Sequence, residues 1–340
     1  MNTTMYAIIG CQHGHIEIFI QEMQELGFAC AGLYERENRA LAEAIAGKYG
    51  ITLVDDCEQL LDDAVGIIGC ASINSEKIDV IELCERHGKH VMVDKPAVVD
   101  EAGLERLKRV VERGRIQVGM LLTERFRPSI YTVKKHIDQG KLGDIVGIST
   151  RKPHRLNPSA RPDWFFVKEQ CGGILIDLLV HDFDLLRWLT GKEIKQMDGV
   201  VGKNILPQYP TFYNTVNLQV VMEDGIVMQL YADWHTPERS WTWGDGRIFV
   251  TGTKGFAELR LEGDPLMGKE PLLLEVTNED EWAKVPLSAP PCTISEDFVR
   301  RIAGESSILT HESIIKASEA AIAADRRAVY TISEMKGVNR

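Results

Sequence analysis

Apolar and polar positions follow one repeating pattern in the first third of the chain. From Met5 to about Leu122, short apolar runs alternate with amphipathic segments, and the runs that read as strands are "MYAIIG", "CAGLYE", "TLVD", "VGIIGCA", "HVMVDKP" and "QVGMLL". "NRALAEAIAGKYG" and "SEKIDVIELCERHG" have helical spacing, and the Gly near the end of the second is expected to cap its helix. Because strands that alternate with helices form βαβ units, this part predicts a doubly wound parallel sheet.

The pattern of apolar and polar positions changes after Arg125. "SIYTVKKHIDQG" and "CGGILIDLLVHDFDLLRWLTG" each predict a helix, and "NTVNLQVVMEDGIVMQLYADW" predicts two long strands joined by a turn at "EDG". This pattern is typical of an α+β domain with a large, mostly antiparallel open sheet. "PLSAPPC" reads as a connection, followed by two C-terminal helices. We therefore expect a first domain over residues 1–123 and a second over residues 124–340.

The helix predicted within residues 171–191, which begins after the Gly pair and ends at Thr-Gly, carries a polar stripe. Asp177, His181 and Asp184 have offsets of 0, 4 and 7, so they share one helical face in an otherwise apolar segment. Burying an ionisable group is costly unless it is paired or faces a wet cavity. The stripe is therefore either a hydrogen-bonded network between helices or the wall of a site. Since one helix supplies all three groups and no further Cys or His pair is evident, no metal is expected.

The turn after the first strand points to a dinucleotide. "IIGCQHGHIEIFIQEM" leads from a strand into a helix, the place where a Rossmann domain offers backbone N–H groups to a pyrophosphate. A G-x-G-x-x-G motif would need glycines at 10, 12 and 15, but the chain has Gly10, Gln12 and His15, with Gly14 displaced by one. Glu35 follows the second strand, where an acid accepts hydrogen bonds from the adenosine ribose. A plain turn and a solvated acid are the alternatives.

Lys95 follows another apolar run and precedes Pro96. It is therefore expected at the carboxyl edge of a parallel strand, where open α/β sheets bind ligands. Proline fixes the backbone there, so the lysine is held at a defined turn. An ordinary surface lysine is the alternative.

Composition narrows the class of protein. The chain has 340 residues, 44% hydrophobic and 26% charged, which suits a soluble protein of two domains. Its net charge of −11, with 39 basic and 50 acidic side chains and no basic block, argues against nucleic acid as a partner. Neither a signal peptide nor a membrane span is recognisable, so we expect a cytoplasmic protein. The seven scattered Cys predict neither disulfides nor a thiolate zinc site.

Several motifs together resemble the glucose-fructose oxidoreductase and inositol dehydrogenase family of NAD(P)-dependent oxidoreductases, also written Gfo/Idh/MocA. "GKHVMVDKP" resembles its E-K-P signature, with Asp94 in place of Glu. "CASINSEK" resembles its A-T-P-N-x-x-H loop, with Ser72 and Asn74 matching and Lys77 in place of His. "TERFRPSIYTVKKHIDQGKLGDI" resembles the segment that opens the second domain, with Arg125 in register.

Two further segments extend the likeness over nearly the whole chain. "VTGTKGFAEL" resembles the family's late G-T-x-G turn. "DWFFVKEQCGGILIDLLVHDFDLLRWL" resembles its W…G-G-x-x-x-D-x-x-x-H-x-x-D segment, and the matching positions are Trp164, Gly172, Gly173, Asp177, His181 and Asp184.

The resemblance implies a role for each candidate residue. It makes Lys95, Asp177 and His181 catalytic, with His181 as the base, Asp177 orienting it and Lys95 stabilising the alkoxide. It implies substrate contacts for Arg125, Trp164 and Asp184. The implied cofactor-binding residues are Gly10, Gln12, His13, Gly14, Glu35, Arg36, Ser72, Asn74, Asp94, Lys95 and Pro96. Glu35 favours NAD by repelling a 2′-phosphate, whereas Arg36 could pair with it, so NADP is possible. We expect Lys77, in place of the family's His, to alter affinity more than chemistry.

The resemblance implies an oxidoreductase that acts on a sugar, sugar acid, cyclitol or related polyol, assembled as a homodimer or homotetramer through the second domain's sheet. A non-catalytic sensor of dinucleotide and ligand is the first alternative. A glycoside-cleaving member that keeps its NAD bound is the second.

Overall fold

A computed structural model describes residues 5–333 of the chain, which form two compact units. The first unit contains the chain up to Leu122 together with Glu169–Gly172 and Cys292–Glu319. The second contains Thr123–Lys168, Gly173–Pro291 and the described residues from Ala320 to Ser333. The first division of the chain between the two units falls between Leu122 and Thr123.

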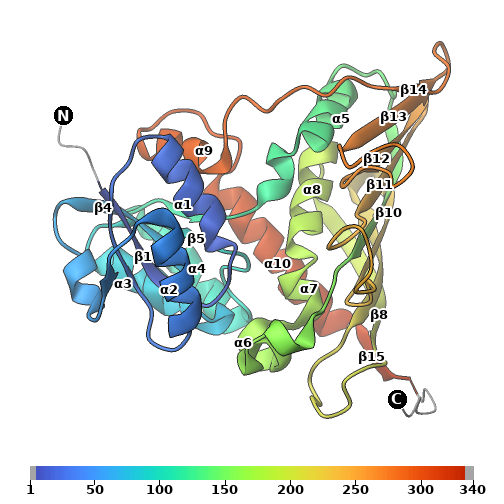
Figure 1. Ribbon diagram of the computed structural model, residues 1–340. Coiled ribbons are helices and arrows are strands. Elements are labelled where there is room, and N and C mark those ends of the chain that lie inside the picture. Colours follow the sequence, from blue (N-terminus) through green and yellow to red (C-terminus); the bar gives the residue numbers. More distant parts are fainter. Residues whose placement is uncertain (1–4, 334–340) are drawn as a thin grey trace. The chain divides into compact units, whose positions relative to one another are not determined.

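The first unit is built on a six-stranded sheet in which all strands are parallel, in the order β3-β2-β1-β4-β5-β6 (Figure 1). Its strands are β1 (Met5–Cys11), β2 (Cys30–Tyr34), β3 (Leu53–Val54), β4 (Val65–Ala71), β5 (His90–Val93) and β6 (Val118–Met120). Each apolar run predicted as a strand is confirmed. The order is that of a Rossmann fold, in which successive strands are added on one side of β1 up to β3 and on its other side from β4 to β6.

Helices connect these strands. They are α1 (Ile16–Glu25), α2 (Arg39–Tyr49), α3 (Lys77–Arg86) and α4 (Glu101–Arg113), with short 3₁₀ turns η1 (Cys57–Leu60) and η2 (Asn74–Glu76). Polar caps start α2 and α4, where Asn38 and Asp100 accept from backbone N–H groups. The predicted cap of α3 is confirmed, because Gly88 follows the helix with a φ of +64°.

The C-terminal helices do not fall where the sequence predicted. Residues 292–319, expected in the second domain, belong to the first unit and include α9 (Ile294–Ile302) and the start of α10 (His311–Arg327). They cover the edge strand β6: Arg301 donates to the Val118 carbonyl at 2.7 Å, and His311 Nε2 accepts from the Val118 N–H at 3.0 Å. An edge strand has unpaired backbone groups, so these contacts complete the sheet.

The second unit is built on a nine-stranded sheet in the order β14-β13-β12-β11-β7-β10-β9-β8-β15. Its strands are β7 (Ile145–Pro153), β8 (Ile194–Lys203), β9 (Thr215–Met222), β10 (Val227–Asp233), β11 (Arg247–Gly252), β12 (Gly255–Arg260), β13 (Leu272–Thr277), β14 (Ala283–Lys284) and β15 (Val329–Ile332). Pairing is antiparallel except between β7 and β10 and between β8 and β15. The predicted hairpin is confirmed, since β9 and β10 are joined by η6 (Glu223–Gly225).

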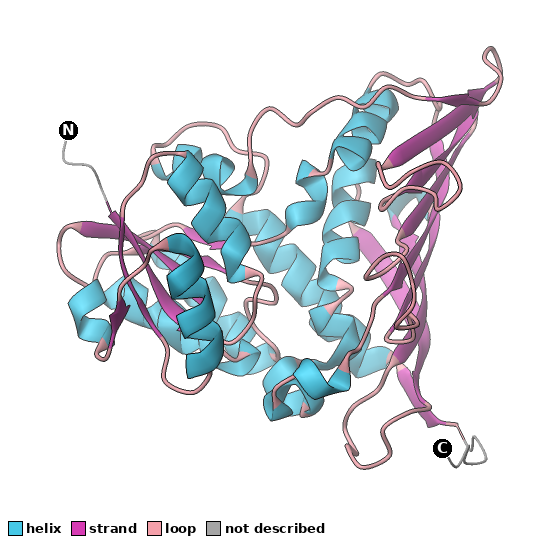
Figure 2. Ribbon diagram, in the orientation of Figure 1, coloured by secondary structure: helices cyan, strands magenta, loops and turns pink. Residues whose placement is uncertain are grey.

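Helices of this unit lie on one face of its sheet (Figure 2). They include α5 (Pro128–Asp138), α7 (Gly173–Asp177) and α8 (Val180–Thr190). The unit also contains the 3₁₀ turns η3 (Thr123–Phe126), η4 (Pro158–Ala160) and η5 (Asp163–Phe166). The helix predicted between the Gly pair and Gly191 is instead two segments, α7 and α8. A short α6 (Lys168–Cys171) ends before Gly172 and Gly173, which have φ values of +90° and +78°, and a turn at 178–179 separates α7 from α8.

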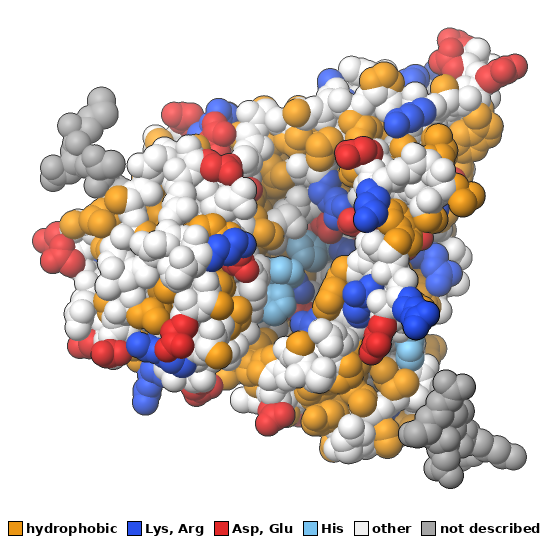
Figure 3. Space-filling view, in the orientation of Figure 1, with side chains coloured by type: hydrophobic (Ala, Val, Ile, Leu, Met, Phe, Trp, Pro, Cys, Tyr) orange, Lys and Arg blue, Asp and Glu red, His pale blue; other side chains and the backbone are white. Residues whose placement is uncertain are grey.

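Acidic and basic side chains are interspersed on the face shown in Figure 3. Within residues 5–333, no helix is both long and apolar enough to cross a bilayer.

Candidate active site

The carboxyl end of β1 is packed too closely for a side chain at Gly10. Its φ is +87°, and a Cβ there would lie 1.9 Å from Ser72 Oγ, which follows β4. Glycine is therefore required on both conformational and steric grounds. The close approach joins the carboxyl ends of β1 and β4, where a Rossmann domain receives its ligand.

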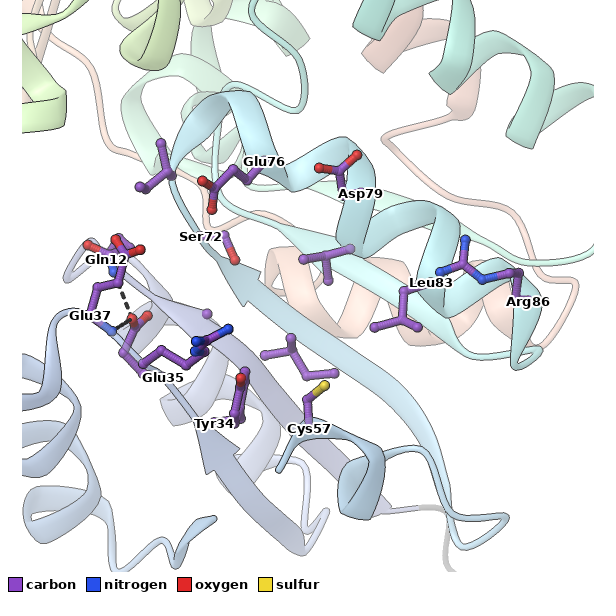
Figure 4. A pocket seen from close by; sticks show the side chains of 15 residues that line it. Gln12, Tyr34, Glu35, Glu37, Cys57, Ser72, Glu76, Asp79, Leu83 and Arg86 are labelled. Atoms are coloured by element: carbon purple, nitrogen blue, oxygen red, sulfur yellow. Dashed lines mark hydrogen bonds between the residues drawn. The ribbon is translucent and has the colours of Figure 1, made fainter. Parts of the chain in front are cut away.

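A pocket of about 500 Å³ opens at this point, which we call the carboxyl-end pocket (Figure 4). It includes five of the predicted cofactor residues, which are Gly10, Gln12, Glu35, Arg36 and Ser72. Other lining residues come from β2, η2 and α3, among them Tyr34, Glu76, Asp79, Leu83 and Arg86. The pocket combines apolar walls with polar groups at strand ends, as a bound adenosine requires.

Glu35 ties the ends of two strands together. Its Oε2 accepts from the Cys11 N–H at 2.5 Å, and its Oε1 accepts from Gln12 Nε2 at 2.7 Å and from the Glu37 N–H at 2.8 Å. The side chain is buried. Gln12, where the glycine motif would have its second glycine, therefore fixes this carboxylate beside the carboxyl-end pocket (Figure 4).

The carboxyl-end pocket has more acidic than basic groups. Its lining contains the carboxylates of Glu35, Glu37, Glu76 and Asp79 against the guanidinium groups of Arg36 and Arg86. Burial raises the pKa of Glu76, and the negative charges of Glu37, Asp79 and Glu35 add to that increase. The field in the pocket therefore opposes an additional anion.

The D-K-P turn after β5 is held by a buried lysine. Lys77 is fully buried at the start of α3, and its Nζ donates to the main-chain oxygens of Asp94 at 2.8 Å, Lys95 at 3.1 Å and Pro96 at 3.3 Å. It also donates to Asn74 Oδ1 at 2.8 Å. Lys95 thus projects from a turn in which three consecutive carbonyls are fixed by one ammonium group.

Asn74 is similarly engaged within the protein. Its amide donates to the Cys171 carbonyl at 3.0 Å while its oxygen accepts from Lys77. The role of Lys77 was not foreseen from the sequence; the only signal was its position in the loop motif, three residues after Asn74.

Two histidines flank the Asp94 carboxylate at the carboxyl ends of β1 and β5. His13 Nδ1 lies 3.2 Å from Asp94 Oδ2, and His15 Nδ1 lies 3.3 Å from Asp94 Oδ1. Burial would raise the pKa of Asp94, but His15, Lys77 and His13 outweigh it and hold the pKa well below its usual range. Burial, together with the neighbouring His15, lowers the pKa of His13 to about 4. At neutral pH the carboxylate is ionised and His13 is neutral.

In the second unit, Arg125 and Asp184 bind each other. Arg125 Nε donates to Asp184 Oδ2 at 2.7 Å and a terminal nitrogen donates to Oδ1 at 2.5 Å, with both side chains buried. Burial raises the pKa of Asp184, against the opposing charge of Arg125. The pair anchors α8 to η3. Each carboxylate oxygen accepts one of these hydrogen bonds, and the expected substrate contacts of the two residues stay a prediction.

Asp177 and His181 lie at the junction of α7 and α8, and both are buried. The Leu178 and Leu179 N–H groups donate to the carbonyls of residues 174 and 175, so the i to i−4 hydrogen bonding passes through the interruption. Asp177 and His181 therefore remain one helical turn apart. Trp164 is buried beside the ring of Phe165.

A second buried charge cluster lies next to α8 and was missed by sequence analysis. Lys152 Nζ is 3.0 Å from Asp182 Oδ2 and 3.7 Å from Glu124 Oε1, and Thr150 donates to Asp182 Oδ1 at 2.7 Å. Lys152 and Thr150 occupy inward positions of β7. Their alternation along the strand was the available signal, but β7 has no distinctive motif.

The strand order, the glycine turn and the carboxyl-end pocket define a dinucleotide-binding Rossmann protein with a second α+β unit. Comparison with known proteins agrees. Residues 4–120 match the family model described as "Oxidoreductase family, NAD-binding Rossmann fold", and residues 130–258 match the "GFO/IDH/MocA C-terminal domain". The chain belongs to the Gfo/Idh/MocA family of NAD-binding oxidoreductases and is an enzyme of the dehydrogenase class.

Individual relatives are similar over most of their length. Inositol 2-dehydrogenase of Rhizobium meliloti (strain 1021) is 29% identical over 254 residues, which cover 73% of this chain and 71% of that protein. A crystal structure of a protein described as an oxidoreductase, from Erwinia carotovora atroseptica SCRI1043, superposes with a TM-score of 0.87 at 25% identity. The match covers 96% of this chain and 98% of that one. Levoglucosan dehydrogenase in complex with NADH has the same fold, with a TM-score of 0.79 at 16% identity, covering 95% and 96%.

Proposed function

We propose that this enzyme transfers a hydride between NAD and a secondary alcohol or ketone of a cyclitol, sugar, sugar acid or related polyol. The observation that carries the proposal is the D-K-P turn, in which Lys95 follows a Rossmann strand and its backbone is fixed by the buried Lys77. The similarity to inositol 2-dehydrogenase supports the substrate class.

The residues present fit the cofactor. Gly10 lines the carboxyl-end pocket without a side chain, at the point where its backbone lies close to Ser72, and the pocket has room for an adenosine. When bound, NAD supplies the hydride acceptor or donor. We propose that Lys95, as an ammonium group, hydrogen-bonds the reacting oxygen and stabilises alkoxide. His181 takes the hydroxyl proton on a ring nitrogen, and Asp177 orients and stabilises the imidazolium.

For Arg125 and Asp184 we propose a positioning role. Their bidentate pair holds α8, the helix that begins one residue before His181. Trp164 remains a proposed wall for substrate.

We propose NAD rather than NADP as the preferred cofactor. Glu35 is buried and held by four hydrogen bonds beside the carboxyl-end pocket, and the surplus of acidic groups there opposes a 2′-phosphate. Calorimetric titration should give tighter binding of NADH than of NADPH. A tenfold preference for NADPH, about 1.4 kcal/mol, would contradict the assignment.

We also propose that the protein forms a homo-oligomer through the nine-stranded sheet. The sheet face away from α5, α7 and α8 presents exposed Val200 and Val227 together with Phe249 and Phe256 on neighbouring strands. Light scattering coupled to size exclusion should report a dimer or tetramer. Val227→Glu should shift that population toward monomer.

The substrate is tested by nicotinamide absorbance in a screen of inositols, aldoses, sugar acids and keto-sugars with both cofactors. Oxidation of at least one polyol is expected. If no polyol or keto-sugar supports a change in absorbance with protein that binds NADH, the proposed substrate class is wrong.

A further inference from the structure

The β1–α1 turn contains a His-x-His pair facing an aspartate. His13 and His15 are separated only by Gly14, and their rings are perpendicular at 4.2 Å between centroids. Both approach Asp94, one at each carboxylate oxygen. One ligand atom from each of the three residues can be chosen so that all lie within 4.8 Å of one another.

These distances suit a transition metal. Bonds of 2.0–2.2 Å to imidazole nitrogen and carboxylate oxygen place two ligand atoms of a tetrahedral ion about 3.4 Å apart. The observed separations are close to that value, 3.2 Å from His13 Nδ1 to Asp94 Oδ2 and 3.3 Å from His15 Nδ1 to Asp94 Oδ1, so each ring faces its own oxygen of the same carboxylate. A small movement of the two rings toward each other would complete a three-ligand set with one position open.

The accessibility of the three groups differs in a useful way. Asp94 is 2% exposed, whereas the His13 and His15 side chains are 28% and 46% exposed, so an ion can enter from solvent onto a fixed carboxylate. A neutral ring needs only to carry its proton on Nε2 for Nδ1 to bind the ion. The nearby ammonium of Lys77 is directed at main-chain oxygens.

We propose that His13, His15 and Asp94 form a binding site for a zinc-class divalent transition metal in the dinucleotide-free protein. Two imidazoles and one carboxylate with an open position are a donor set that such ions accept. His13 and Asp94 are also expected to approach the dinucleotide, so metal and NAD exclude each other. The mutual exclusion of metal and NAD rests on the proposed function; metal binding itself does not.

The test is titration of metal-free, dinucleotide-free protein with Co²⁺, followed by visible absorption, and with Zn²⁺, followed by calorimetry. One ion per chain is expected, with the absorption bands of a four- or five-coordinate site. His13→Ala and His15→Ala should each weaken binding at least tenfold, since even indirect support of a ligand is worth 10–100-fold. The double variant should lose the site.

His87→Ala is the matched control, because His87 is an exposed histidine of the same unit, after α3. It should bind Co²⁺ as the unaltered protein does, and circular dichroism should show all variants folded. If the folded double variant binds Co²⁺ with unchanged affinity and spectrum, the site does not exist. NADH should displace Co²⁺; simultaneous independent binding would overturn the exclusion. Because no substrate is present, failure of the dehydrogenase assignment would leave the Co²⁺ result intact.

Discussion

The ammonium group of Lys77 donates to the main-chain oxygen of Asp94 at 2.8 Å, from a fully buried position. The same group binds the next two carbonyls, so it sets the backbone from which Lys95 projects. A charge is buried here because several oxygens replace its water shell.

Replacing this lysine should affect both stability and turnover. In Lys77→Met the three carbonyls and Asn74 lose their donor, and we expect a loss of at least about 2 kcal/mol in the free energy of unfolding. Well below the melting temperature, kcat per folded molecule should still fall at least about tenfold, because the turn is no longer fixed. Lys48→Met, which removes an exposed ion pair to Glu17, is the control and should change neither. Normal kcat in folded Lys77→Met would exclude a positioning role.

Lys95→Ala should leave the fold intact and depress turnover about 10²-fold or more through lost alkoxide stabilisation. Steady-state kinetics and a melting curve measure the two effects separately. A change in turnover below about threefold would remove Lys95 from the mechanism.

His181→Asn should lower kcat by about 10²–10⁴-fold, the loss of a general base, with dinucleotide affinity nearly unchanged. Asp177→Asn alone should lower kcat relative to the unaltered enzyme. The double variant should have a kcat scarcely below that of His181→Asn, because the imidazole that Asp177 orients is gone. Stopped-flow and steady-state measurements of kcat on the unaltered enzyme and the three variants form a double-mutant cycle. If the variants instead melt several degrees lower with normal turnover per folded molecule, the residues form a structural network.

Breaking the Arg125–Asp184 pair should be strongly destabilising. Asp184→Asn leaves a buried guanidinium without its charge partner, and we expect a loss of about 3–5 kcal/mol in urea unfolding. Replacing both residues with apolar side chains, Arg125→Met with Asp184→Leu, should recover much of that loss, since no charge stays buried. A loss below about 1 kcal/mol in Asp184→Asn would show that the pair does not anchor α8.

Stability should fall as pH decreases from 6.5 toward 4, in part through His311. Burial, with the charge of Arg301, lowers the pKa of His311 to about 4, and its Nε2 must be unprotonated to accept from Val118. Between pH 4 and 6.5 the unfolded state therefore binds more protons at this histidine, so stability rises with pH across that window. His311→Gln should have a flatter melting-temperature profile over this range than the unaltered protein. His13 contributes to the acid loss in both proteins, so the difference between profiles reports on His311 alone. Identical slopes would contradict the assignment.

Much of the fold follows from the sequence, because its signals are local. A short apolar run such as Val91–Val93 and a capped amphipathic helix such as Arg39–Tyr49 can be recognised from consecutive residues alone. Covalent neighbours also determined that Lys95 follows a strand and precedes a turn. The sequence predicted the parallel sheet, the antiparallel second sheet and the family for this reason.

Only the tertiary structure decided what the isolated polar residues contact. Asp184 and Arg125 are 59 residues apart in sequence, and nothing in the spacing of Asp184 from His181 shows that a guanidinium occupies both of its oxygens. Residues 292–319 return to the first unit because the edge strand β6 has unpaired backbone groups, a requirement created by the folded sheet. Periodicity fixes which face a side chain lies on, but the partner on that face depends on contacts between segments far apart in the chain.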